Sequence, residues 1–155
     1  MSDRQELMRV WARIVRVKQA LEGVIERELK RAGVLPLAWY NVLLELERAP
    51  EGRLAPRDLE REILIAQYNL SRLLDRLERE GLVRRKGFPG DARRQLVEIT
   101  SAGRKRRAET WPVYAAAVES YAGQRLPAGE LRLLLDLLGR LLPLAEQDQR
   151  RKETA

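Results

Sequence analysis

The sequence predicts a mainly α-helical fold with a winged helix-turn-helix, a small β-hairpin wing and a helical dimerisation region built from the terminal helices. Alanine, leucine, glutamate and arginine dominate, and aromatic residues make up only 5% of the 155 residues. Apolar residues recur at helical spacing along most of the chain, and only residues 82–100 have the composition of a hairpin. We therefore expect a single domain over residues 1–155, with the winged lobe in residues 36–100 and the dimerisation region in residues 3–32 and 101–147.

Missing residue types exclude several classes of chemistry. The chain has no cysteine, which excludes disulfides, thiolate metal sites and thiol redox sensing, and no histidine, the commonest general base and neutral metal ligand. The carboxylates show no metal-ligand spacing, and no glycine-rich phosphate loop is present. We expect no enzymatic activity, no cofactor and no metal. No signal peptide or apolar run of about 20 residues is found, which predicts a cytoplasmic protein without a membrane partner.

The positive charge is concentrated in one segment. Residues 82–107 carry nine basic side chains and two acidic ones, an excess equal to the whole net charge of +7. Concentrated positive charge indicates an anionic partner, and fork-shaped arginine side chains suit phosphate or guanine. Double-stranded DNA is the partner that this pattern predicts, although a genome rich in G and C would produce the same excess of arginine over lysine without any function.

Both ends of the chain predict helices that pack against a second subunit. Over residues 3–30, apolar side chains recur every seven residues in two interleaved series, which is typical of a helical seam. The series are Leu7, Ile14 and Leu21, and Val10, Val17 and Val24. From Pro127 to about residue 147, leucines cover most of the circumference of a final helix, so this helix must be buried on several sides. A homodimer would bury both helices, while a core helix within a monomer is the alternative for the first.

Three further helical patterns form a helix-turn-helix. Residues 36–47 and 56–63 each begin with a proline, which the first turn of a helix tolerates. Residues 67–80 follow after a brief connection and place leucines at positions 70, 73, 74 and 77 on one face. Arginines project from the opposite face, together with Tyr68 and Asn69. This layout predicts a recognition helix that enters a DNA groove, while an ordinary solvated helix face would show the same charges.

A β-hairpin is predicted directly after the recognition helix. Gly81 can take the left-handed conformation that ends a helix, LVRRK has the pattern of a short strand, and RRQLVEIT has that of the returning strand. The turn-rich GFPGDA places the tip around residues 88–92. Thr100 or Ser101 would cap the helix that starts at about residue 102. A hairpin in this position is a wing, whose arginines would either enter the minor groove or simply keep a polar edge strand from aggregating.

These segments together resemble the MarR family of winged-helix transcription regulators over almost the whole chain. The motif SRLLDRLEREGLVRR, followed by DARR, VEIT and Gly103, is similar to the family pattern of Thr/Ser-Arg-Leu-Val-Asp-Arg-Leu-Glu, Gly-Leu-Val, Asp-x-Arg and Leu-Thr-x-x-Gly. The resemblance implies a homodimer whose recognition helices enter the major groove, with Arg93 as the wing arginine in the minor groove and Asp91 orienting the wing. It also implies repression of genes, and release from the operator when a small aromatic or phenolic ligand binds.

Several positions depart from the family pattern. Ala92 stands where many members carry a second wing arginine, a role that Arg94 could take over. Ala66 replaces the usual serine at the cap of the recognition helix, and Tyr68 occupies a site that is often small and polar. Both differences predict an unusual base preference. Glu60 replaces a residue that is often small, so the packing of the preceding helix is expected to differ as well.

The candidate DNA-binding residues lie on the recognition helix and in the wing. Arginine suits guanine and asparagine suits adenine, so side chains of the recognition helix are expected to approach base edges. Other basic residues are expected to hold phosphates. The candidates are Gln67, Tyr68, Asn69, Arg72, Arg76, Arg85, Asp91, Arg93 and Arg94. The residues expected mainly to hold phosphates are Arg84, Arg85, Lys86 and the run from Arg104 to Arg107.

A small-molecule effector would bind between the dimerisation helices and the winged lobe. The candidates are aromatic residues and one cation that could pair with an acidic ligand: Trp11, Arg16, Trp39, Tyr40, Trp111 and Tyr114. Aromatic residues at helical spacing also serve as ordinary core, and Arg16 could be plain surface. The alternative function is a basic helical protein that associates with DNA, or a structural protein, without a ligand response.

Overall fold

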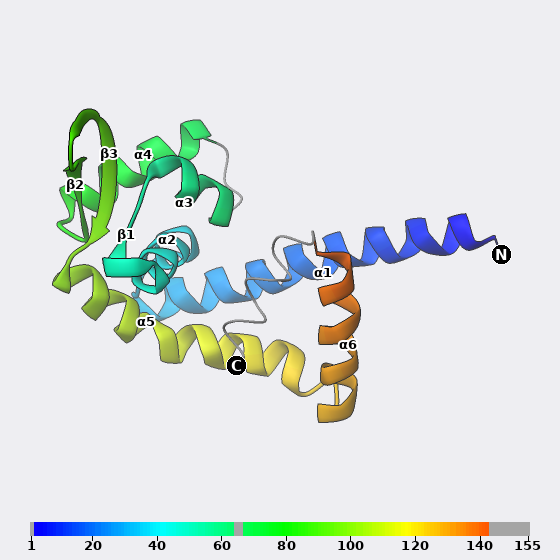
Figure 1. The fold of residues 1–155 in the computed structure, drawn as a ribbon. Helices are drawn as coiled ribbons and strands as arrows, with labels where there is room; N and C mark the ends of the chain where they lie inside the picture. The colour runs from blue at the N-terminus through cyan, green and yellow to red at the C-terminus, as the bar shows by residue number, and fades with distance from the viewer. Residues whose placement is uncertain (1, 64–66, 143–155) are drawn as a thin grey trace. The chain divides into compact units, whose positions relative to one another are not determined.

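The computed structural model describes residues 2–63 and 67–142, which fall into two compact units, one up to residue 117 and one from residue 118 onward (Figure 1). The first unit holds α1 (Asp3–Ala32), α2 (Leu37–Arg48), β1 (Arg53–Leu54), α3 (Pro56–Ile63), α4 (Gln67–Arg79), β2 (Val83–Phe88), β3 (Asp91–Ile99) and nearly all of α5 (Ser101–Val118). The second holds a π-helical turn (Glu119–Gly123) and α6 (Ala128–Leu141). The winged lobe predicted over residues 36–100 therefore lies within the first unit, while a single domain for the whole chain stays a prediction.

The helix ends follow from local residues. Gly33 takes a left-handed conformation with φ of +66°, so that its N–H and that of Val34 donate to the last carbonyls of α1. Gly81 closes the chain after α4 in the same way, with φ of +71°. At the start of α5, the hydroxyl oxygen of Thr100 accepts the N–H of Gly103 at 3.0 Å. Of the two predicted caps for α5, Thr100 is thus the one used.

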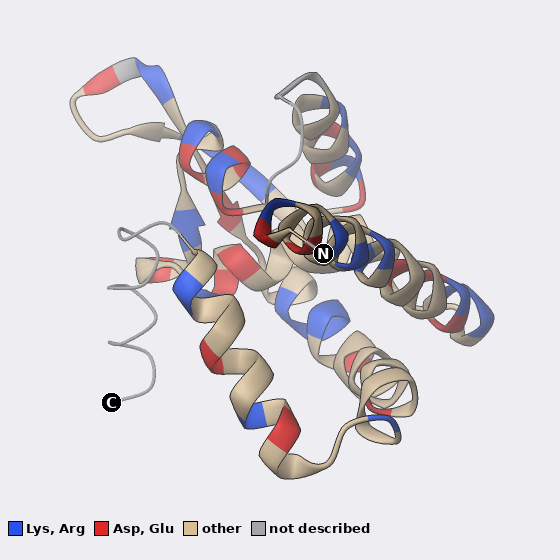
Figure 2. Ribbon diagram, turned by 90° about the vertical axis from the view of Figure 1, so that its right-hand side faces the viewer, with Lys and Arg blue, Asp and Glu red and all other residues tan. Residues whose placement is uncertain are grey.

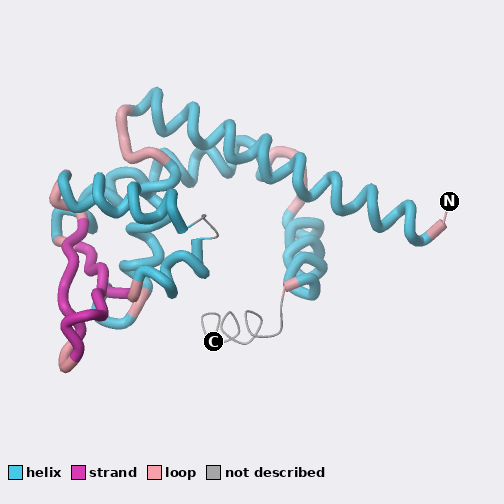
Figure 3. Tube along the Cα trace, turned by 90° about the horizontal axis from the view of Figure 1, so that it is seen from above, coloured by secondary structure: helices cyan, strands magenta, loops and turns pink. Residues whose placement is uncertain are grey.

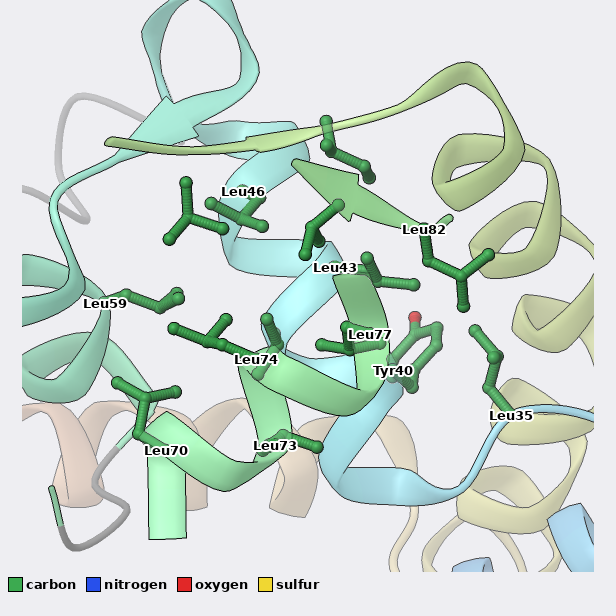
Figure 4. Packing of buried hydrophobic residues seen from close by; sticks show 14 residues of the cluster. Leu35, Tyr40, Leu43, Leu46, Leu59, Leu70, Leu73, Leu74, Leu77 and Leu82 are labelled. Atoms are coloured by element: carbon green, nitrogen blue, oxygen red, sulfur yellow. The ribbon is translucent and has the colours of Figure 1, made fainter. Parts of the chain in front are cut away.

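The core of the first unit is built on the predicted leucine stripe of α4. All four leucines of that stripe are buried, and Leu74 and Leu77 are among the least exposed side chains (Figure 4). They pack with residues of α2, α3, β2 and β3 in one cluster. The members are Leu35, Tyr40, Val42, Leu43, Leu46, Leu59, Leu70, Leu73, Leu74, Leu77, Leu82, Val83, Val97 and Ile99. Because the stripe is fully used in packing, the opposite face of α4 is held toward solvent.

The predicted hairpin belongs to a three-stranded antiparallel sheet with strand order β1-β3-β2 (Figure 3). The strand β1 was missed, because two residues are too short to show an alternating pattern; it pairs Arg53 with Glu98 and Leu54 with Val97. The predicted tip at residues 88–92 is too wide. Strand β2 runs to Phe88 and β3 restarts at Asp91, which leaves a two-residue turn of Pro89 and Gly90.

Gly103 allows α5 to approach the hairpin closely. A Cβ atom at this position would overlap the carbonyl oxygen of Leu82 and would come within 2.8 Å of Ile99 Cγ1. The glycine in the VEIT-x-x-Gly segment is therefore required by close packing, which is a physical reason for its place in the motif.

The terminal helices expose apolar side chains. In the first half of α1, Leu7, Val10, Trp11 and Val17 are all exposed, whereas Ile25 and Leu29 near its end are buried. In α6 the exposed leucines are Leu131, Leu133, Leu134, Leu135, Leu137, Leu138 and Leu141. The burial predicted for this last helix is thus not provided by the described part of the single chain. Residues 143–147 of the predicted helix lie outside the described residues.

Candidate nucleic-acid interface

The outward face of α4 carries exposed arginines. Asn69, Arg72, Arg76 and Arg79 are all exposed, on the side of the helix opposite the buried leucines. Within the described residues, the side chains of Arg72 and Arg76 form no hydrogen bond or ion pair. Gln67 and Tyr68 belong to the first turn of α4, but their side chains lie outside the described part. The helix therefore presents guanidinium groups that no described carboxylate neutralises.

The tip of the wing is shaped by Asp91. Its Oδ1 accepts the backbone N–H of Arg93 at 3.0 Å. Gly87 pairs with Gln95 and Phe88 with Asp91, so the three residues between Asp91 and Gln95 bulge out of the ladder. Figure 2 shows an acidic and a basic stretch side by side at this looped end of the hairpin. The two wing arginines predicted to contact DNA thus lie in a bulge that re-aims their side chains.

The two wing arginines have different surroundings. The guanidinium carbon of Arg94 lies 5.0 Å from the centre of the Phe88 ring, a cation–π distance. Arg93 is exposed and has no ion pair with any described residue. Arg94 also lines a groove of about 870 Å³. The groove lies between α3, α4 and both strands of the hairpin, and its lining comprises Ala55, Pro56, Arg57, Glu60, Leu70, Ser71, Leu74, Arg85, Arg94 and Gln95.

Most other cations of the basic segment are paired with carboxylates. Across the hairpin, the carboxylate of Glu98 accepts a hydrogen bond from Arg84 Nε at 3.1 Å and forms an ion pair with Lys86 Nζ at 3.0 Å. These two cations hold the pKa of Glu98 below its usual range. Glu47 of α2 forms ion pairs with Arg104, at 3.6 Å, and with Arg107 of α5. The residues predicted to hold phosphates are therefore largely occupied within the protein.

Arg85 faces α4 rather than open solvent. Its Nη2 lies 2.6 Å from Asp75 Oδ1, and its Nη1 forms an ion pair with Glu78. Burial works to lower the pKa of the guanidinium, but the hydrogen bonds that it donates to Asp75 and Glu78 outweigh this effect, so the pKa of Arg85 is raised. Sequence reasoning missed these two carboxylates as partners, because their spacing on α4 says nothing about a strand that follows the turn.

The candidate effector residues are only partly brought together. The rings of Tyr40 and Tyr114 stack at 4.7 Å, and Trp111 stacks on Tyr114 at 5.9 Å. Tyr40 is fully buried, and burial raises the pKa of its phenol despite the nearby Arg107. Trp39 packs partly buried against the same core. By contrast, Trp11 and Arg16 lie on the exposed surface of α1. Four of the six candidates thus gather at α2 and α5, and two do not join them.

Comparison with known proteins agrees with this geometry. Residues 33–94, which include α2 to β2 and the start of β3, match the model of the MarR family. The chain is 28% identical to Sco3205 of Streptomyces coelicolor, a MarR family transcriptional regulator whose structure was determined in complex with DNA. That match covers 91% of this chain and 87% of Sco3205, with a TM-score of 0.77. The chain is therefore similar to MarR family regulators in its winged lobe and over most of its fold. Its winged-helix fold is that of these transcriptional regulators.

Two further matches extend over most of the chain. An uncharacterised HTH-type transcriptional regulator of Bacillus anthracis is 26% identical over 144 residues, which make up 93% of this chain and 94% of that protein. CouR of Rhodococcus jostii RHA1, solved with p-coumaroyl-CoA bound, is 26% identical, with a TM-score of 0.69 over 83% of this chain and 87% of CouR. Among the described residues, no helix is both long enough and apolar enough to cross a membrane.

Proposed function

We propose that the protein is a homodimeric repressor that binds a pseudo-palindromic operator, with α4 in the major groove and the hairpin tip in the adjacent minor groove. The observation that carries this proposal is the contrast in pairing. Arg72, Arg76 and Arg93 are exposed and have no described carboxylate partner, whereas all three cations of β2 and most of those at the start of α5 do. Side chains left without an internal partner are available to a polyanion.

The residues of the interface have distinct roles in this proposal. Arg72, Arg76 and Asn69 approach base edges in the major groove, where arginine suits guanine and asparagine suits adenine. Gln67 and Tyr68, at the start of the same helix, are weaker candidates for base contacts. Arg93 enters the minor groove, where a narrow width concentrates negative potential. Asp91 fixes the backbone from which Arg93 projects, and Arg94 contributes from the groove beside α3.

Dimerisation supplies the second half of the interface. The apolar side chains exposed on α1 and α6 are numerous enough to require cover, since large contiguous apolar patches are uncommon on monomers. In a dimer, two copies of α4 would meet half-sites about one helical turn, roughly 34–36 Å, apart. Light scattering coupled to size-exclusion chromatography measures the assembly directly. A monomer at micromolar concentration would contradict the dimer.

An aromatic or phenolic effector is the regulatory signal that we propose. The ring cluster around Tyr40 and Tyr114 supports this role, and the related CouR was solved with p-coumaroyl-CoA. Trp111, which stacks on Tyr114, should report binding through its fluorescence. Titration with phenolic acids should quench that emission and release DNA. If neither changes for any compound of this class, the cluster is core and the protein acts without a ligand.

Selection of bound sequences from random duplex DNA is the experiment that tests the main proposal. A dimeric regulator should enrich an inverted repeat, and the selected duplex should bind more tightly than its scrambled version at the same salt concentration. Equal affinity for the two duplexes would favour the alternative of a basic protein that associates with DNA without sequence preference. We propose no catalytic role, and a cytoplasmic location follows from the DNA partner.

A further inference from the structure

Arg85 connects the wing to the recognition helix through three contacts. Its guanidinium reaches Asp75 with one terminal nitrogen, at 2.6 Å, and Glu78 with the other. The other carboxylate oxygen of Glu78 accepts the backbone N–H of Arg85 at 3.2 Å. One side chain of β2 and two of α4 thus form a closed unit, which we call the Arg85 bridge.

The bridge sits at a place where the hairpin has little other support. Strand β2 is an edge of the sheet, since the order is β1-β3-β2, and its outward N–H groups have no strand partner. One of these donors, the backbone N–H of Arg85, donates to the carboxylate of Glu78. In the ladder, Arg85 lies opposite Val97 of β3. The contact therefore fixes both the side chain and the backbone of β2 against α4.

The neighbouring Arg84 shows that this arrangement is specific to one position. Arg84 projects from the other face of β2 and pairs with Glu98 inside the sheet, and its side chain is 57% exposed. The side chain of Arg85 is only 24% exposed, and its partners come from a different element. An exposed pair within a hairpin contributes little, whereas a two-pronged pair that joins two elements restricts their relative position.

We propose that Arg85 is a positioning residue for operator binding: the Arg85 bridge fixes the reach of the wing relative to α4, so that Arg93 and the arginines of α4 meet adjacent grooves together. This inference rests on the proposed DNA-binding mode. It replaces the sequence-based expectation that Arg85 itself contacts DNA. Preorganisation of this kind raises affinity because less conformational freedom is lost when DNA binds.

The double variant Asp75→Asn with Glu78→Gln separates positioning from direct contact by the sign of its effect. Removing two carboxylates beside a polyanion strengthens binding on electrostatic grounds and frees Arg85 to reach phosphate. Loss of a positioning bridge weakens DNA binding instead, and we expect the double variant to lose operator affinity by about tenfold. The matched control is Glu80→Gln, which removes a carboxylate that pairs with no described residue at the end of the same helix; its affinity should be unchanged or slightly higher.

Arg85→Lys provides a second, independent variant. Lysine keeps the charge that a phosphate contact needs but lacks the planar fork that spans two carboxylates. We expect Arg85→Lys to lose affinity about as strongly as the double variant, with a melting temperature that confirms a folded protein. Retention of wild-type affinity in Arg85→Lys would overturn the proposal, as would tighter binding by the double variant.

A spectroscopic signal tests positioning without DNA. Because the sequence has no cysteine, Gln95→Cys on the wing provides a unique site for a nitroxide label. The label should become more mobile in the free protein when Arg85→Lys or the double variant is added, and stay unchanged with Glu80→Gln. Unchanged mobility in all variants would refute the bridge. Failure of the labelled parent protein to prefer its selected operator would instead refute the DNA-binding mode and leave the mobility result standing.

Discussion

The exposed face of α4 and the paired strands of the hairpin carry the same residue type in opposite electrostatic settings. Arg72 and Arg76 stand on a helix whose other face is fully buried, and no described acid pairs with them. Arg84 and Lys86 both form ion pairs with Glu98, so much of their positive charge is neutralised within the sheet. The difference teaches that the count of basic residues along the chain does not show which cations are free to meet DNA, because that depends on how they pair in three dimensions.

This contrast corrects an inference from the sequence. Residues 82–107 hold an excess of positive charge equal to that of the whole protein. In the structure, acids from outside that segment neutralise several of its cations, namely Asp75, Glu78, Glu47 and Glu109. The arginines of α4 precede residues 82–107 and form no such dense run in the sequence. Fewer of them are neutralised by carboxylates than of the cations in residues 82–107.

Substitution of the α4 arginines should have the largest effect on DNA binding. We expect Arg72→Ala and Arg76→Ala each to weaken operator binding by about 1–3 kcal/mol, the range for a good contact between arginine and a base edge. Fluorescence anisotropy with the selected duplex measures the loss. The melting temperature should be unchanged, because neither side chain contacts the core. Wild-type affinity in both variants would remove α4 from the interface.

Arg93→Ala should follow, with a loss of about 1–2 kcal/mol, as expected for a charged hydrogen-bonding group. The variant should remain a folded dimer, since the Arg93 side chain has no described ion-pair partner. Replacing the A·T-rich flank of the operator with G·C pairs should reduce wild-type affinity and leave the variant less affected. Undiminished operator binding by Arg93→Ala would exclude the wing from the mechanism.

Glu47→Gln should affect stability instead of binding. This carboxylate pairs with both Arg104 and Arg107, and the side chain of Arg107 is only 20% exposed. Loss of the charge on Glu47 leaves a partly buried guanidinium without its partner, and we expect about 1–2 kcal/mol of lost unfolding free energy in urea denaturation. The specificity ratio between operator and scrambled DNA should stay the same. A change in that ratio would place the start of α5 in base recognition.

Glu98→Gln should show the smallest effect and a defined pH dependence. Because its cations lower the pKa of Glu98, the ion pairs stabilise the fold above the ordinary glutamate pKa and are lost as the pH falls through the lowered value. In thermal melts, the difference between wild type and variant should therefore begin to shrink below about pH 4.3 and vanish below the lowered pKa of Glu98. At neutral pH the freed Arg84 and Lys86 should bind operator and scrambled DNA slightly more tightly and steepen the salt dependence. A constant difference in stability across the pH range would contradict the role assigned to Glu98.

The sequence predicted most helices and the inward face of α4, because these features depend on spacing within a few residues. Leucines at helical intervals, Gly33 and Gly81 at helix ends, and Thr100 as a cap each have a local cause. The features that were missed are non-local. Strand β1 forms only because β3 is present to pair with it.

The candidate site was predicted less completely than the fold. The outward arginines of α4 followed from helical geometry, but the partners of Arg85 and Arg107 come from other elements. No periodicity within a segment encodes which carboxylate a cation will meet across the fold. For the same reason, the six effector candidates could be named but not grouped: three of them form one stack of rings, and Trp39 packs against the neighbouring core.

The most direct test of the central claim compares Arg76→Ala with Arg84→Ala on the selected operator and on its scrambled version, at one salt concentration. If the unpaired face of α4 reads the operator, Arg76→Ala should lower the ratio of the two affinities by about tenfold or more, while Arg84→Ala changes it by less than about twofold. Equal losses in the two variants would contradict the distinction between unpaired and paired cations.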